Sequence, residues 1–203
     1  MEFSDLMNMM GPFMGGEAVP LQEQLAVLRG LGLEIPEAAA RELPPEGAYW
    51  MTLESLGCGK YDFDASVWTP SSRQIYSFDS EVPDIENMYI TYLKGLQAIS
   101  EGELTFTEEC QDLSAVDWDG PSGKVAVMFC LNGEVCRFDA EFMGDWLDLR
   151  IRGAVNEVLA RQGCKKRFFA TGASQGETIF FCTAEWAEQL EAATQCHMSD
   201  GTD

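Results

Sequence analysis

The chain has a single histidine, His197, among its 203 residues. A Ser-His-Asp or Cys-His arrangement would have to use this residue as its proton acceptor. His197 lies in the polar stretch CHMSDGTD near the C-terminus, which we expect to be frayed. A mobile base cannot hold the geometry that proton transfer needs, so the sequence argues against these enzyme classes, and we assign no catalytic residue.

Basic residues are scarce as well. The chain has 13 Lys and Arg against 34 Asp and Glu, which gives a net charge of −21. Nucleic acids and anionic membranes bind proteins largely through Lys and Arg, so we expect neither of them as a partner. A surface this acidic is either a solvated face that keeps the protein soluble or a surface that docks on a basic protein.

The sequence also lacks paired cysteines and long apolar runs. The seven cysteines are scattered and form no CxxC pair, which excludes a zinc knuckle or a thioredoxin-type redox site, and we interpret them as reduced core thiols. No apolar run approaches the roughly 20 residues of a membrane span, and Glu2 and Asp5 stand where a secretory signal needs positive charge. We predict a cytoplasmic protein with no metal and no cofactor.

Residues 1–47 differ from the rest of the chain. They are rich in Met, Gly and Pro, with one short helical pattern at Leu21, Leu25 and Leu28 that Gly30 closes. We predict short helices and irregular structure here. Residues 48–203 form the main α+β domain in this prediction.

Short runs rich in β-branched and aromatic residues, bounded by Gly, Pro, Asn or Asp, predict strands in this domain. The Asn132-Gly133 dipeptide between two of them is typical of a two-residue hairpin turn. The predicted strands are 49–57, 65–69, 73–78, 103–108, 124–131, 134–142, 166–171 and 177–183.

Helical periodicity predicts three helices. The first lies between Asp84 and Gly102, the second between Asp145 and Gly163, and the third spans 184–196. In the second helix we expect Asp145 to be the N-cap and Asp148 to complement the helix dipole in the first turn.

Two similar stretches lie about 60 residues apart. YSFDSEVPD (76–84) and CRFDAEFMGD (136–145) each read as a strand end followed by a helix start. This predicts two tandem ββαβ units, about 61–120 and 121–183, although two unrelated junctions with similar capping would look the same. In either case the fold class is α+β, with mainly antiparallel sheets and helices packed on one face.

The carboxylates are numerous but form no recognisable site. Asp139 and Glu141 fall on the solvent side of a strand. VDWDGPSGK (116–124) resembles a calcium loop only in its centre, because Ala115 and Ala126 occupy the two end positions that need acidic ligands. We predict a turn there and no metal site.

The basic residues concentrate in one part of the chain. They either complement the dipole at a helix end or pair with the acidic surface of a second copy. A homo-oligomer is therefore one of the two alternatives. The concentration comprises Arg150, Arg152, Arg161, Lys165, Lys166 and Arg167. We expect Arg150, Arg152 and Arg161 on the solvent side of the second predicted helix, or near it.

These observations favour a non-enzymatic acidic cytoplasmic protein that binds a basic protein, of the kind of the immunity or antitoxin proteins that neutralise basic bacterial nucleases. Aromatic residues flanked by acids are plausible anchors in a basic cleft. The candidate partner-binding residues are Trp118, Asp119, Asp139, Glu141 and Trp146. The alternatives are a carboxylate-dependent hydrolase with a cleft between the two units and an oligomeric scaffold.

Overall fold

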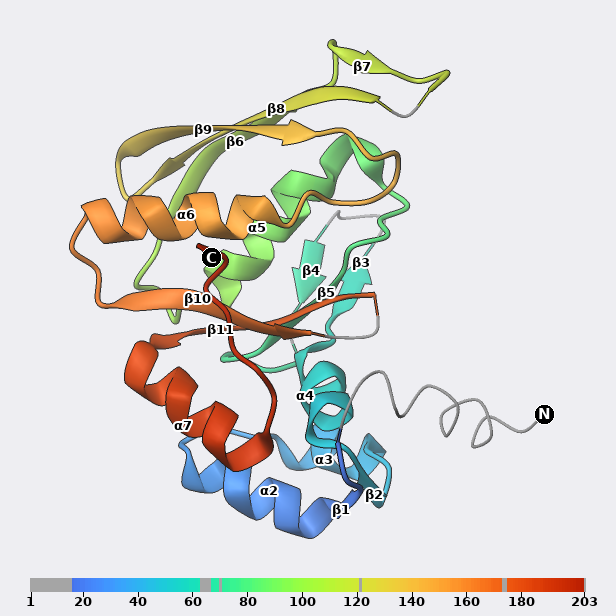
Figure 1. Cartoon of the computed structure of the whole chain (residues 1–203), viewed down its shortest axis with the longest axis vertical. Coiled ribbons are helices and arrows are strands. Elements are labelled where there is room, and N and C mark those ends of the chain that lie inside the picture. Colours follow the sequence, from blue (N-terminus) through green and yellow to red (C-terminus); the bar gives the residue numbers. More distant parts are fainter. Residues whose placement is uncertain (1–15, 63–66, 70, 121, 173–174, 203) are drawn as a thin grey trace.

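Two antiparallel sheets stack with a layer of helices between them (Figure 1). The computed structural model describes residues 16–62, 67–69, 71–120, 122–172 and 175–202. A second helical layer covers the far side of one sheet, so the order of layers is sheet, helices, sheet, helices. The protein is therefore a mixed α+β protein with antiparallel sheets, as its sequence predicts.

The upper sheet has one exposed face. Its strands pair in the order β6-β8-β9, with β7 added at one end of β8, and α5 and α6 cover its inner face only (Figure 1). Side chains of β8 and β9 alternate between buried and accessible, as expected for a sheet with one solvated face. The elements are β6 (Phe106–Asp112), β7 (Val116–Asp117), β8 (Ser122–Leu131), β9 (Glu134–Glu141), α5 (Met88–Ala98) and α6 (Arg150–Arg161).

The lower sheet has helices on both faces. Its strand order is β10-β11-β5, and neighbouring side chains of β11 bury on opposite sides, Phe180 and Phe181 belonging to different apolar clusters. One face meets α5 and α6, and the other meets the second helical layer (Figure 1). The strands are β5 (Tyr76–Asp79), β10 (Lys166–Gly172) and β11 (Gly176–Thr183).

The second helical layer combines both ends of the chain. Leu25 and Leu28 of α2 and Leu190 of α7 share one apolar cluster with Phe180 of the lower sheet. Two short antiparallel strand pairs, β1 with β2 and β3 with β4, lie outside the main sheets. The remaining elements are β1 (Val19–Pro20), α2 (Leu21–Gly30), α3 (Glu37–Glu42), β2 (Glu46–Gly47), α4 (Tyr49–Gly57), β3 (Lys60–Asp62), β4 (Val67–Thr69), η1 (Ile85–Asn87) and α7 (Ala184–Thr194).

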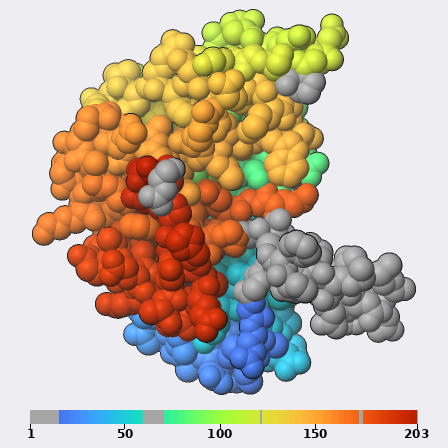
Figure 2. Space-filling model, viewed as in Figure 1, coloured from blue at the N-terminus to red at the C-terminus, as the bar shows by residue number. Residues whose placement is uncertain are grey.

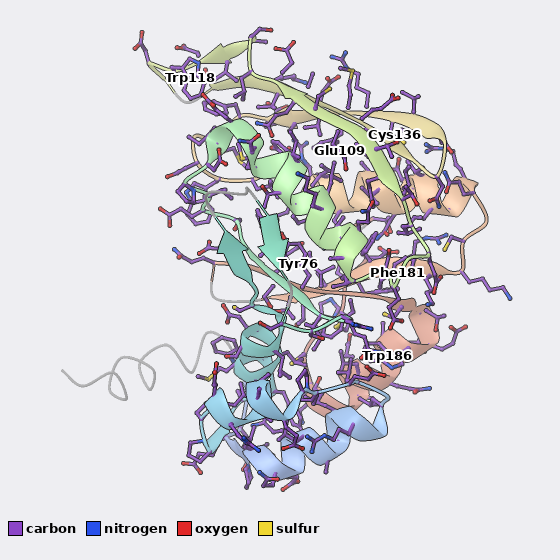
Figure 3. All side chains as sticks on the ribbon, turned by 180° about the vertical axis from the view of Figure 1, so that it is seen from behind. Tyr76, Glu109, Trp118, Cys136, Phe181 and Trp186 are labelled. Carbon is purple, nitrogen blue, oxygen red and sulfur yellow. The ribbon has the colours of Figure 1, made fainter. Side chains whose placement is uncertain are left out.

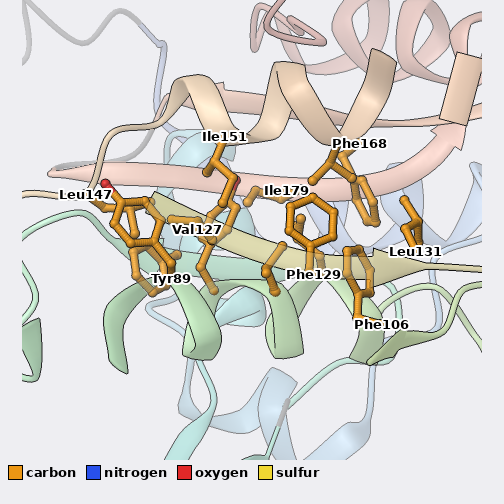
Figure 4. Close-up of a cluster of buried hydrophobic side chains, with 14 of the residues drawn as sticks. Tyr89, Phe106, Val127, Phe129, Leu131, Leu147, Ile151, Phe168 and Ile179 are labelled. Atoms are coloured by element: carbon orange, nitrogen blue, oxygen red, sulfur yellow. The ribbon is translucent and has the colours of Figure 1, made fainter. Parts of the chain in front are cut away.

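The main core lies between the two sheets, around α5 and α6. Phe129 and Leu131 of β8 point inward toward Ile151 and toward Phe168 and Ile179 of the lower sheet (Figure 4). These five side chains are almost completely buried. Burial of this apolar surface is the main stabilising contribution to the fold, at about 25 cal/mol for each Å² removed from water.

Apart from the short elements η1 and β7, the chain passes twice through the order strand, helix, strand, strand. The first pass is β5-α5-β6-β8 and the second is β9-α6-β10-β11. Each pass starts in one sheet and ends in the other, and its first strand pairs with the last strand of the other pass, β5 with β11 and β9 with β8. The strand before β5, β4, pairs with β3 instead of β5. An internal duplication stays a prediction.

Two local predictions are wrong. Residues 49–57 form the helix α4 and not a strand; Thr52, Leu53 and Leu56 bury one helical face. The helix predicted to start at Asp145 begins at Arg150, because residues 145–147 instead pair with the segment that follows β5. Val82 N–H donates to Asp145 C=O at 2.7 Å, and Leu147 N–H donates to Ser80 C=O at 2.8 Å. The N-cap position of α6 is Leu149, and the Asp148 carboxylate just before it accepts a hydrogen bond from Arg150 N–H.

The C-terminal segment is anchored, contrary to the expected fraying. Ser199 pairs with Ala170 of β10 through two backbone hydrogen bonds. The Arg152 guanidinium donates to Ser199 C=O at 2.7 Å, and the Asn156 amide donates to Asp200 C=O at 2.8 Å. The fraying was predicted from the polar side chains of this segment, but the contacts that anchor it involve its backbone C=O groups.

The remaining helix predictions agree more closely with the structure. The predicted helix 184–196 is found as α7, whose N-cap Thr183 accepts a hydrogen bond from Trp186 N–H. The helix predicted after Asp84 starts with a single 3-10 turn and continues as α5. Within the described ranges, every helix is too short or too polar to span a lipid bilayer.

Candidate functional site

Large apolar side chains are exposed on two neighbouring turns, at 117–120 and at 143–146, at the end of the upper sheet. The exposed fraction is 60% for Trp118, 46% for Met143 and 39% for Trp146. We call these three residues the tryptophan surface. Exposed aromatic residues that gather in one place mark binding sites more often than apolar residues scattered singly.

The turn between β7 and β8 projects from the end of the upper sheet (Figure 2), and Trp118 lies near its tip (Figure 3). β7 folds back on β8, pairing Val116 with Gly123, and the Asp117 carboxylate accepts hydrogen bonds from the N–H groups of Asp119 and Gly120. This Asx turn is the turn that the sequence predicts in 116–124. The close pairing requires Gly123, whose φ is 111° and where a Cβ would lie 2.4 Å from Ala115 C=O.

The segment Phe142–Met143 links the two tryptophans. The Trp118 ring packs edge-on against the Phe142 ring, with centroids 5.3 Å apart. Trp146 forms an isolated β-bridge with Met143 and another with Glu81, which follows β5. Phe142 itself is buried in the main core, so it fixes the tryptophan surface to the body of the protein.

Exposed carboxylates surround the tryptophan surface. Asp119 follows Trp118, Asp145 precedes Trp146, and Glu81 bridges Trp146. Glu141 precedes Phe142 and lies 3.5 Å from the ammonium group of Lys124. Aromatic anchors with an acidic rim are complementary to a basic surface on a partner protein.

The structure brings some of the predicted residues together and leaves one apart. Trp118, Asp119, Glu141 and Trp146 all lie beside the Phe142–Met143 segment. Asp139 instead lies on the exposed face of the upper sheet, where its carboxylate is 2.8 Å from the Arg137 guanidinium. Sequence reasoning missed Met143, because only the turn of residues 143–146 exposes this side chain.

Asp148 lies at the N-terminus of α6, just before the helix and not in its first turn as predicted. Its carboxylate is buried and accepts hydrogen bonds from the Arg150 side chain and from the backbone N–H groups of Glu141 and Arg150. Burial raises the pKa of Asp148, but these hydrogen bonds outweigh that effect and lower the pKa below its usual value. Asp148 therefore stays ionised and joins the end of β9 to the start of α6.

A cavity of about 480 Å³ lies beside the C-terminal segment. The guanidinium of Arg152 and the carboxylate of Glu177, both almost buried, line it and form an ion pair with an N–O distance of 2.8 Å. Hydrolysis by two carboxylates needs a second acid roughly 5–10 Å from the first. Among the described residues that line the cavity, Glu177 is the one acid, and Arg152 already binds it.

Most of the concentrated basic side chains are paired within the chain. Arg150 binds Asp148, Arg161 binds Glu134, and Lys166 binds Glu103. Arg152, which we expected on the solvent side of its helix, is buried against Glu177, and this expectation is wrong. The residue faces the lower sheet because Phe168 and Ser199 offer it backbone acceptors there.

The seven cysteines are free thiols. Cys136 and Cys196 are buried, while Cys58 and Cys110 are exposed, so only part of the set lies in the core. Burial raises the pKa of the Cys182 thiol to about 12. A protonated thiol is a weak nucleophile, and Cys182 therefore has a packing role in the lower sheet.

No protein-family model matches this chain, and the comparisons with curated proteins and with solved structures find no match either.

Proposed function

We propose that this chain is a non-enzymatic cytoplasmic protein that uses the tryptophan surface to bind a basic protein. The observation that carries the proposal is the clustering of Trp118, Met143 and Trp146, exposed together within a rim of carboxylates. Binding energy in protein interfaces concentrates in a few aromatic and Arg anchors, and Trp is the most enriched of these. An inhibitor of the immunity or antitoxin type is the concrete form of this proposal.

Charge gives the expected mode of association. The net charge of −21 attracts a basic partner over long distances, and the carboxylates around the tryptophans orient it during encounter. Salt screens this attraction within about 8 Å at physiological ionic strength. The complex should therefore form more slowly and bind less tightly as salt rises.

Affinity capture from a lysate of the source cells tests the proposal. The full chain, tagged, is used at low and near-physiological salt, and the retained proteins are identified by mass. We expect a near-stoichiometric basic protein that leaves as salt rises. With the partner purified, the double variant Trp118→Ala/Trp146→Ala should bind at least about 30-fold more weakly, since a hot-spot residue contributes 2 kcal/mol or more.

A matched double variant controls for the loss of exposed apolar area. Met128 and Val135 are also large and exposed, but they lie on the outer face of the upper sheet. Met128→Ala/Val135→Ala should bind the partner as the wild type does. The proposal fails if both double variants bind equally well, or if the unaltered chain retains no basic protein at either salt concentration.

A further inference from the structure

Strand β9 is an open edge of the upper sheet. Among the strands that the structure describes, β9 pairs with β8 alone. The two-residue Asn132-Gly133 turn makes Leu131 and Glu134 a hydrogen-bonded pair. The backbone N–H and C=O groups of alternate residues from Glu134 onward therefore bond to β8. The groups of Val135, Arg137, Asp139 and Glu141 point to the free side.

Two hydrogen bonds confirm this alternation. Phe142 N–H donates to Gly123 C=O of β8 at 3.0 Å, so Phe142 continues the series of alternate residues that bond to β8. Glu141 N–H, on the free side, donates to the Asp148 carboxylate at 3.0 Å. Asp148 thus covers the end of the edge and leaves the backbone groups around Arg137 and Asp139 open to another strand.

The opposite edge is protected and β9 is not. The register of β6 shifts between Thr107 and Cys110, and Glu108 adopts a φ of 57°. Such a bulge twists an edge away from other strands. β9 has eight residues in unbroken register, without proline, so it keeps the geometry that accepts a new strand.

The charges along β9 favour a second copy of this chain as that strand. Each acid of β9 is paired with a basic side chain: Glu134 with Arg161, Asp139 with Arg137, and Glu141 with Lys124. The edge is therefore locally neutral on a chain whose net charge is −21. Two such edges approach each other without the repulsion that the rest of the surface would impose.

We propose that two copies of the chain pair antiparallel through β9, about a two-fold axis at Phe138. This register places Arg137 opposite Asp139 of the second copy, and Asp139 opposite Arg137 of the second copy. A register centred one residue earlier would set two Arg137 side chains opposite each other, which is unfavourable. The half-buried Phe138 rings meet at the axis, and the upper sheets join into one continuous sheet.

Sedimentation velocity of the full chain over a concentration series tests this dimer, which does not depend on the proposed partner. We expect a dimer whose dissociation constant falls as salt rises to about 0.15 M, because salt screens the net repulsion. Arg137→Asp and Asp139→Arg should each weaken the dimer at least tenfold, since like charges then face each other. The double variant Arg137→Asp/Asp139→Arg should restore it.

Arg29→Asp is the control for net charge. It makes the same change in charge as Arg137→Asp, and it also breaks an exposed ion pair, with Glu37, but on α2. This variant should dimerise as the wild type does, and circular dichroism checks the fold of every variant. A monomer at all concentrations, a dimer that either single exchange leaves unchanged, or a double variant that stays monomeric would overturn the proposal.

Discussion

The ion pair between Arg152 and Glu177 shows what a single buried side chain contributes to this fold. The Arg152 guanidinium connects three parts of the chain. It donates hydrogen bonds to Glu177 of β11, to Phe168 C=O of β10 and to Ser199 C=O of the C-terminal segment. A buried ion pair adds little net stability by itself, since desolvation offsets its attraction. Removing one partner, however, leaves the other charge uncompensated.

Arg152→Ala should therefore lower the free energy of unfolding by about 3–5 kcal/mol. The measurement is urea unfolding followed by circular dichroism at neutral pH. Arg161→Ala is the matched control on the same helix, because it breaks only the solvent-screened ion pair with Glu134 and should change the stability much less. Equal losses in the two variants would show that the Arg152 site is solvated in solution.

Asp148 should make the stability depend on pH at the acid end. Its pKa is lower in the folded protein than in the unfolded chain, so its ionised form stabilises the fold above the unfolded pKa of about 4. This contribution disappears as the pH falls through the folded pKa. The wild type should lose more stability than Asp148→Asn as the pH falls below about 4.

Urea unfolding at a series of pH values measures this difference. Asp145→Asn serves as the control, because it removes an exposed carboxylate from the same connection between β9 and α6. The control should keep the acid dependence of the wild type. Parallel stability curves for Asp148→Asn and the wild type would contradict the assignment.

At the scale of elements, α5 packs on β5 through a glycine. A Cβ at Gly95 would lie 2.2 Å from two ring carbons of Tyr76, which is buried in the main core. The helix therefore approaches the lower sheet more closely than any other residue type at this position allows. The contact sets the distance between the middle helices and the sheet below them.

Gly95→Ala should lower the free energy of unfolding by about 1–3 kcal/mol, because overpacking outweighs the gain in helix propensity. Gly30→Ala, at the end of α2, has no atom within 4 Å of the new Cβ and should stabilise the protein by up to about 1 kcal/mol. Opposite signs in urea unfolding confirm the close approach. A stabilising Gly95→Ala would show that the Tyr76 ring moves aside.

The sequence predicts elements where local chemistry decides and fails where distant partners decide. The strands from 124 to 183 and the final helix follow from alternation, from Asn132-Gly133 and from the Thr183 cap, all of which act locally. Residues 49–57 have the aromatic content of a strand, but burial against β5 favours a helix. Asp145 looked like a cap, but its carbonyl group is used by Val82, which is distant in sequence.

The candidate site is predictable only in part, for the same reason. Trp118 and Trp146 stood out as aromatics among acids, and the turn at 116–124 could be read from its Asp and Gly residues. Their common neighbour, Phe142, could not be identified, because its contact with Trp118 depends on β7 folding back over β8. Exposure of Met143 likewise depends on pairing between distant segments.

Over the whole molecule, some acidic side chains are paired with basic ones and others are not. The acids of β9, and Asp148 beside α6, each form an ion pair with Arg or Lys. Asp119, Asp145 and Glu81, around the tryptophan surface, have no ion pair within the described part of the chain. The two proposed interfaces therefore differ in character. The neutral edge of β9 is compatible with the same edge of a second copy. The acidic rim of the tryptophan surface is complementary to a basic surface on a partner protein.

The central strand of the lower sheet is made after both of its neighbours. β11 lies between β10 and β5, and its pairing with β5 joins residues about 100 positions apart. At roughly 5–20 residues per second, β5 leaves the ribosome about 5–20 seconds before its partner exists. Until then β5 has no strand to pair with, and the apolar side chains that the lower sheet later buries stay accessible to solvent.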